Sequence, residues 1–76
     1  MYIISIMNFK GDIKMISEKI KELRENKGIS QYRLAELTGI YRSTINRYEN
    51  GLIQKISFDN LLKICEALGV DIKNII

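Results

Sequence analysis

Residues 31–50 read QYRLAELTGIYRSTINRYEN, and this stretch decides the fold. It contains Ala35, Gly39 and Ile45. A small residue in the middle of one helix lets a second helix pass close by. A glycine four residues later supplies the positive φ that a sharp turn requires. The spacing therefore predicts two short helices that cross at a tight turn.

The first of these helices is expected to begin after Ser30, whose hydroxyl can accept a hydrogen bond from a free backbone N–H at the helix N-terminus. Its apolar face comprises Leu34, Ala35 and Leu37, with Thr38 beside them. Because this apolar stripe is short, we expect the helix to depend on packing against its neighbours.

The second helix is predicted over about residues 42–50, with Ile45 and Tyr48 spaced to face the core. The residues predicted to point outward are polar or basic and include no carboxylate: Arg42, Ser43, Asn46 and Arg47. Arginine can donate two hydrogen bonds to guanine, asparagine can pair in the same bidentate way with adenine, and serine or tyrosine can contact bases or phosphates. A polar surface helix alone is common. After the Ala/Gly/Ile turn, however, it favours nucleic-acid binding.

The sequence SQYRLAELTGIYRSTINRYENG, residues 30–51, resembles the lambda-repressor and Cro-type (Xre-like) helix-turn-helix regulators. The resemblance extends over about residues 16–76, because ISFDNLLKICEALGVDIKNII looks like the family's fourth and fifth helices. It implies an all-α fold, a compact bundle of about five short helices, that binds double-stranded DNA. By this resemblance, the residues facing the DNA groove would be Tyr41, Arg42, Ser43, Asn46 and Arg47. Gln31 would bond a phosphate and help orient the recognition helix, and Asn50 would contact the DNA backbone.

Arg24 and Glu49 occupy positions at which this family often places an ion pair between the first helix and the end of the recognition helix. Such a pair would neutralise the one acid near the predicted DNA-reading face and would hold the recognition helix in place. The alternative is two independent surface charges, which would contribute little to stability.

The net charge of the chain is +3, and it is unevenly distributed. In residues 41–57 the charged residues are Arg42, Arg47 and Lys55 against Glu49, whereas residues 59–76 hold three acids and two lysines. A basic region attracts phosphate backbones. Lys55, in the loop after the recognition helix, is therefore a predicted contact to the DNA backbone.

The composition limits the classes of function. The 76 residues, of which 46% are hydrophobic and none is proline, predict one small helical domain. The chain has no histidine and one cysteine, so it lacks the parts for a zinc site, an internal disulfide or a histidine-activated nucleophile. We therefore expect no enzymatic activity, metal, cofactor or small-molecule substrate. Cys65 is expected to pack as a small core residue, with a redox or intermolecular role as the alternative.

The first helix is predicted over about residues 13–26, with Ile16, Ile20 and Leu23 on its inner face. Ser57 is expected to cap a later helix that Gly69 ends. The residues of that helix expected to be buried are Leu61, Leu62, Ile64, Cys65 and Leu68.

Asp71 is expected to cap a final short turn over residues 72–76. The isoleucines of this turn, Ile72, Ile75 and Ile76, would either pack back on the first helix or form a dimer contact.

Residues 2–7, YIISIM, are β-branched and apolar and differ from the helical pattern that follows. Because the run is short and no positive charge precedes it, a signal peptide or membrane span is not expected. We predict a short strand within an N-terminal extension, residues 1–12, before a DNA-binding domain formed by residues 13–76. A lone strand leaves its backbone unpaired, so we expect it to pair with the same segment of a second subunit. The alternative is a mobile tail.

The sequence thus predicts a transcription regulator that acts as a homodimer on an inverted-repeat operator in the cytoplasm. Its two recognition helices would enter major grooves about 34 Å apart, because the protein's two-fold symmetry must match the site. The simplest mechanism is repression by occlusion of a promoter. The alternative is a protein-interaction module, such as an antitoxin that neutralises a partner protein.

Overall fold

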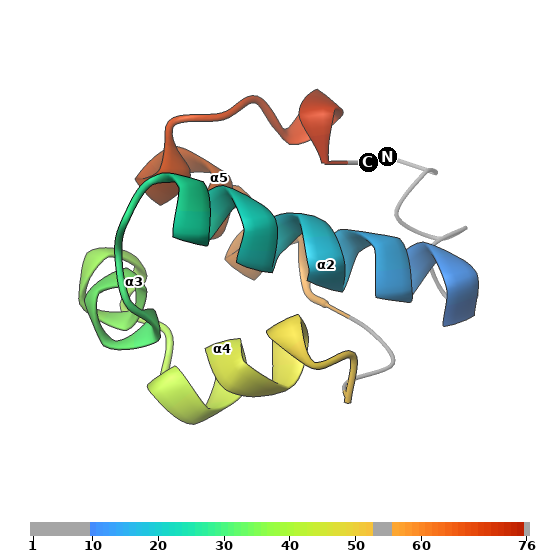
Figure 1. Ribbon diagram of the computed structural model, residues 1–76, viewed down its shortest axis with the longest axis horizontal. Coiled ribbons are helices and arrows are strands. Elements are labelled where there is room, and N and C mark those ends of the chain that lie inside the picture. The colour runs from blue at the N-terminus through green and yellow to red at the C-terminus, as the bar shows by residue number, and fades with distance from the viewer. Residues whose placement is uncertain (1–9, 53–55, 76) are drawn as a thin grey trace.

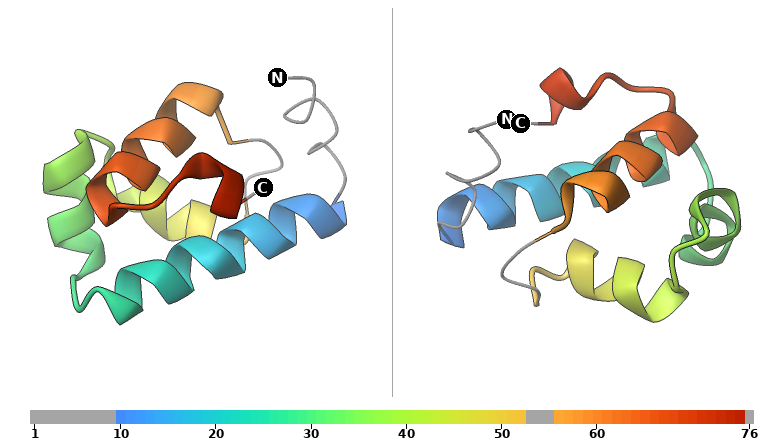
Figure 2. Two further views of the ribbon diagram at one scale, coloured as in Figure 1. Left: turned by 90° about the horizontal axis from the view of Figure 1, so that it is seen from above. Right: turned by 180° about the vertical axis from the view of Figure 1, so that it is seen from behind.

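The computed structural model describes residues 10–52 and 56–75. In those ranges four α-helices precede one 3₁₀ turn: α2 (Lys10–Asn26), α3 (Gln31–Thr38), α4 (Arg42–Glu49), α5 (Phe58–Leu68) and η1 (Ile72–Asn74). Figure 1 shows α2 running along the molecule, with α4 below it and α3 near its C-terminal end. In the two views of Figure 2, α5 lies beside α2, and η1 lies on the side of the bundle away from α4. Within the described ranges, no helix has the length and apolar character needed to cross a bilayer.

The all-α prediction is confirmed for the described residues, but the count of about five helices is not supported. The fifth helix implied by the family resemblance is only the 3₁₀ turn η1. The short turn capped by Asp71 is confirmed, because Asp71 Oδ1 accepts from the backbone N–H of Lys73 at 3.0 Å. The N–H of Ile75 donates to the carbonyl of Ile72 at 3.0 Å, and such i to i+3 bonds wind the chain more tightly than an α-helix does. Ile75 is buried in the core, so it packs back on the bundle, whereas Ile76 lies outside the described residues.

Helix α2 begins at Lys10, three residues before its predicted start at residue 13. The predicted domain boundary between residues 12 and 13 therefore falls inside a helix. A glycine costs a helix only about 1 kcal/mol relative to alanine, so Gly11 does not interrupt a run of good helix formers. The predicted strand at residues 2–7 lies outside the described residues.

The hydrophobic core lies where the four helices meet, and every helix contributes to it. Its buried side chains are Ile16, Ile20, Leu34, Ile40, Ile45, Tyr48, Ile56, Leu61, Ile64, Cys65, Leu68 and Ile75. Helix α3 packs against both α4 and α5, and α2 also contacts α4 and α5. Because α4 buries Ile45 and Tyr48 against these neighbours, its opposite side is left at the surface.

Two leucines that the apolar pattern placed inside are not fully buried. Leu37 is 47% exposed, and Leu62 is half-buried. Residues three apart on a helix are offset by about 60°, and Leu37 lies on the flank of Leu34 that faces away from Ala35. Thr38 takes the inner position instead and is 9% exposed.

The turn between α3 and α4 is built by Thr38 and Gly39. Thr38 Oγ1 donates to the carbonyl of Leu34 at 2.8 Å and accepts from the N–H of Ile40 at 3.2 Å, so the buried hydroxyl is satisfied. Gly39 has φ 76° and donates its N–H to the carbonyl of Ala35 at 2.8 Å. Ser30 caps the other end of α3 by accepting from the N–H of Arg33. These local bonds define where α3 begins and ends.

We expect Gly39→Ala to lower the free energy of unfolding by about 1–2 kcal/mol, the cost of a left-handed backbone for a residue with a Cβ. No atom lies within 4 Å of the position that the new Cβ would take, so the loss comes from backbone strain alone. Urea unfolding followed by circular dichroism measures it. Gly39→Asn is the control and should lose less, because asparagine tolerates this conformation. Equal unfolding midpoints for all three proteins would contradict the expectation.

Cys65 is a core residue, 3% exposed. Burial raises the pKa of its thiol, and the negative charge of Asp71 raises it further. Because the folded pKa exceeds the unfolded one, this group does not affect stability below about pH 8.5, and stability falls as the pH rises above it.

We expect a thiol reagent at neutral pH to label the Cys65 thiol of the protein in urea but not that of the native protein. Rapid labelling of the native protein would contradict this.

Candidate nucleic-acid interface

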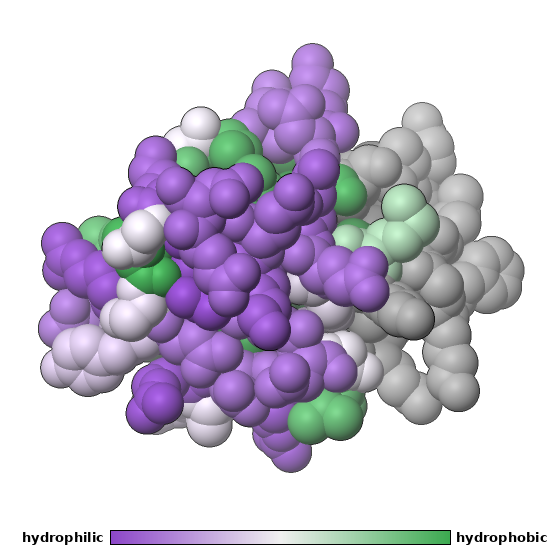
Figure 3. Space-filling view, viewed as in Figure 1, coloured by the Kyte–Doolittle hydropathy of each residue, from purple (hydrophilic) through white to green (hydrophobic). Residues whose placement is uncertain are grey.

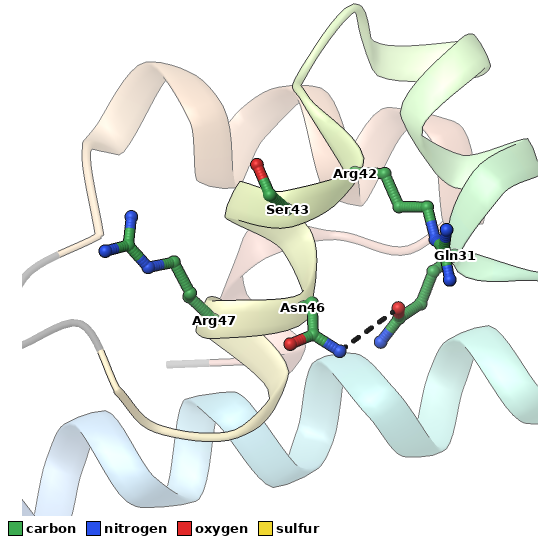
Figure 4. Close-up of a pocket in the computed structure, with 5 residues that line it drawn as sticks. All are labelled: Gln31, Arg42, Ser43, Asn46 and Arg47. Carbon is green, nitrogen blue, oxygen red and sulfur yellow. Dashed lines mark hydrogen bonds between the residues drawn. The ribbon is translucent and has the colours of Figure 1, made fainter.

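The outward side of α4 carries four exposed polar side chains on an eight-residue helix. With Gln31 of α3 they line a hollow of about 400 Å³, and they are Arg42, Ser43, Asn46 and Arg47. In Figure 4 the side chains of Arg42 and Asn46 extend toward Gln31, whereas Arg47 extends away from it. Residues four apart lie on one side of a helix. The hollow is therefore bordered by two neighbouring rows of residues, Arg42 with Asn46 and Ser43 with Arg47, and each row contains one arginine.

Two further residues predicted to contact DNA flank this helix. Tyr41 precedes α4 at the N-cap position, where it is 82% exposed and makes no side-chain capping bond. Asn50 follows α4, and its Nδ2 donates to the backbone carbonyl of Asn46 at 2.9 Å and to Asn46 Oδ1 at 3.2 Å. Lys55 lies outside the described residues. Tyr41 is thus free to contact a partner, while the Asn50 amide closes the end of α4.

Arg24 of α2 and Glu49 of α4 form a buried, bidentate ion pair. Arg24 Nε lies 2.7 Å from Glu49 Oε2, and Nη2 lies 3.1 Å from Oε1. The remaining nitrogen, Nη1, donates to the carbonyl of Ile29 at 2.7 Å. The hydrogen bond to Glu49 raises the pKa of Arg24 and outweighs burial, which lowers it, so the guanidinium stays charged.

This ion pair has an electrostatic and a mechanical consequence. The Glu49 side chain is 1% exposed, so the one carboxylate of α4 is withdrawn from the surface that carries Arg42 and Arg47. Two parallel hydrogen bonds between guanidinium and carboxylate also restrict geometry. The pair therefore holds the end of α4 against α2.

Gln31 connects the buried pair to the exposed side of α4. Its Nε2 donates to Glu49 Oε1 at 3.0 Å, and its Oε1 accepts from Asn46 Nδ2 at 3.3 Å. The family resemblance implies a phosphate contact for Gln31, whereas neither of these bonds follows from the sequence. They place Gln31 at the junction of α3, α4 and the ion pair.

Asn60 is a positioning residue that is not among those predicted from the sequence. Its Nδ2 donates to Tyr48 Oη at 2.9 Å, which ties α5 to the inner side of α4. The contact joins two helices through residues twelve apart, and no local spacing pattern indicates it. Together with Arg24, it fixes α4 from both of the helices behind it.

The surface around α4 is mostly polar. Figure 3 shows the side of the molecule formed by α2 and α4, which is largely hydrophilic with small apolar patches. In the described ranges, no group of three or more His, Cys, Asp or Glu side chains is arranged to hold a metal ion. The arrangement is a rigid helix with an exposed polar and basic side, framed by a tight turn.

A family model described as helix-turn-helix matches residues 20–74. The chain belongs to the lambda-repressor and Cro-type helix-turn-helix family. In this helix-turn-helix unit α3 is the first helix and α4 the second. The identification agrees with the resemblance carried by residues 30–51.

Solved and curated relatives support the same family. The crystal structure of the restriction-modification controller protein C.AhdI from Aeromonas hydrophila matches with a TM-score of 0.82 and 33% identity, over 87% of this chain and 98% of that one. The SPbeta prophage-derived HTH-type transcriptional regulator YonR from Bacillus subtilis is 38% identical over 74% of this chain and 51% of its own length. Antitoxin PezA from Streptococcus pneumoniae is 34% identical over 82% of this chain and 39% of its own length. This chain thus spans about half or less of these two curated relatives.

Proposed function

We propose that this helix-turn-helix protein binds double-stranded DNA in a sequence-specific manner and regulates transcription. The observation that carries the proposal is the exposed side of α4, where two arginines, a serine and an asparagine line one hollow and the only acid of the helix is buried. These side-chain types read base edges in the major groove. The names of the relatives YonR and C.AhdI support a regulatory role.

Each predicted contact has a role in this proposal. Direct contacts to bases come from Tyr41, Arg42, Ser43, Asn46 and Arg47. Contacts to the phosphate backbone come from Gln31, Asn50 and Lys55, and these set the register of the protein on the duplex. No step in this function requires catalysis, a metal or a cofactor.

We further propose that the protein acts as a homodimer on an inverted-repeat operator and represses by covering a promoter. Two-fold symmetry would place the α4 helices of the two subunits about 34 Å apart, one turn of DNA. The protein would act in the cytoplasm, where the chromosome of a prokaryotic cell lies.

Selection of bound sites from random duplex DNA tests the proposal. We expect enrichment of a sequence with two inverted half-sites whose centres are about 10 base pairs apart. Affinity for that site should fall steeply as salt rises, because bound arginine and lysine side chains release counterions from the phosphates. Failure to enrich any sequence would contradict the proposal.

A second candidate is an antitoxin-like interaction module, which the similarity to PezA favours. Such a module would bind a partner protein tightly. Capture of a stoichiometric protein partner, together with absence of salt-sensitive DNA binding, would favour this candidate over the regulator.

A further inference from the structure

Four polar side chains form a continuous hydrogen-bonded chain from the buried ion pair to the exposed side of α4. It begins at Arg24, passes through Glu49 and Gln31, and ends at Asn46. Figure 4 shows its last link, between Asn46 and Gln31. Because this series of hydrogen bonds starts at a buried ion pair, the donor and the acceptor of each bond are determined.

The direction follows from which atoms can donate and which can accept. An ionised carboxylate only accepts hydrogen bonds. Glu49 Oε1 therefore requires the amide nitrogen of Gln31 to face it, which is the observed arrangement at 3.0 Å. The oxygen of Gln31 then faces Asn46 and requires the amide nitrogen there, again as observed at 3.3 Å. If either amide were flipped, two donors or two acceptors would face each other.

This order leaves Asn46 with a particular set of free hydrogen-bonding positions. One Nδ2 hydrogen is used by Gln31, and one lone pair of Oδ1 is used by Asn50 Nδ2 at 3.2 Å. One N–H donor and one acceptor lone pair remain on an exposed side chain. Adenine offers the matching pair in the major groove, an acceptor at N7 and a donor at N6.

We propose that the buried Arg24–Glu49 pair sets base preference at a distance: through Gln31 it fixes which way the Asn46 amide faces, and so makes adenine the base that Asn46 prefers. This inference rests on the proposed DNA-binding function and deepens it. Glu49 and Gln31 are positioning residues, and Asn46 is the residue that touches the base. The same order leaves one N–H of Gln31 free for a phosphate.

The first test uses the free protein and therefore does not depend on DNA. Gln31→Met keeps the length of the side chain and leaves the ion pair in place, but it removes both hydrogen bonds of the amide. In NMR spectra of ¹⁵N-labelled protein, we expect the side-chain amide resonances of Asn46 to shift in this variant. Those of Asn60, which bonds Tyr48 on the inner side of α4, should stay in place and show that the fold is intact. Unchanged Asn46 resonances would overturn the inference.

The second test measures base preference on the selected operator. The position read by Asn46 is found as the one where Asn46→Ala abolishes the preference. At that position we expect Gln31→Met to reduce the preference for adenine on the order of tenfold, comparable with the discrimination of one bidentate contact. The preferences read by Arg42 and Arg47 should be unchanged. In the Asn46→Ala background, Gln31→Met should cause no further loss of preference at that position.

Glu49→Gln provides an independent variant, because it replaces one oxygen of the carboxylate, an acceptor, with an amide nitrogen, a donor. The Gln31 amide can then turn over, and the hydrogen bonds from residue 49 to Asn46 can reverse their direction. It should also lose the adenine preference. An equal loss of affinity on all sequences with Gln31→Met would overturn the inference, because Gln31 would then act only as a phosphate contact. If the wild-type protein enriches no site, both the base preference and the proposed DNA-binding function are contradicted. The NMR test is separate, because it shows in the free protein whether Gln31 orients the Asn46 amide.

Discussion

Arg24→Ala is expected to lower the free energy of unfolding by about 3–5 kcal/mol, because it leaves the Glu49 carboxylate buried without a compensating positive charge. In a domain of this size each kcal/mol shifts Tm by about 4–8 °C. The variant should therefore melt at least about 12 °C below the wild type in a circular-dichroism scan. Its DNA affinity should also fall, since the end of α4 loses its attachment to α2.

Two further variants separate a buried pair from an exposed one. Arg33→Ala removes the pair with Glu36 on α3, whose side chains are 56% and 46% exposed, and should cost less than about 1 kcal/mol. Replacing both Arg24 and Glu49 with leucine removes both charges and should recover much of the stability lost in Arg24→Ala, since apolar residues can replace a buried pair. If Arg24→Ala melts with the wild type, the pair does not hold α4 in place.

Arg42→Ala and Arg47→Ala are each expected to lower affinity for the preferred operator by about 5- to 150-fold, the value of about 1–3 kcal/mol for a bidentate contact to guanine. Both side chains are exposed on α4, so their loss should not affect folding. Competition binding at constant salt measures the change. Base-specific loss indicates direct readout, and equal loss on all sequences would assign these arginines to phosphates.

Lys73→Ala is the matched control for these arginines. It also removes one positive charge, but from η1, on the side of the molecule opposite α4 (Figure 1). Its affinity for the operator should stay within a few-fold of the wild-type value, since surface charges beyond a Debye length are largely screened. A loss equal to that of Arg42→Ala would mean that net charge, and not the surface of α4, governs binding.

The turn at the centre of the fold could be predicted because its requirements are local. Ser30 accepts from an N–H three residues away, and Gly39 needs only its own φ and one bond to Ala35. Such features depend on the residue type and its immediate neighbours. The burial of Ile45 and Tyr48 followed for the same reason, from their spacing on one helix.

The remaining details depend on contacts between distant parts of the chain. Thr38 and Leu37 lie on opposite flanks of Leu34. Which flank is buried depends on where α4 and α5 lie relative to α3, and the spacing within α3 does not specify it. Likewise, the bonds of Gln31 to Glu49 and of Asn60 to Tyr48 form only when helices meet. The Arg24–Glu49 pair was expected through resemblance to a family, because its residues are twenty-five positions apart.

The central claim is that the exposed side of α4 enters the major groove of its operator. Backbone amide shifts recorded while the selected duplex is added to ¹⁵N-labelled protein test this claim most directly. We predict that the largest changes occur along α4 and at the start of α3, around Gln31. Changes confined to α5 and η1, with α4 unaffected at saturating DNA, would contradict the claim.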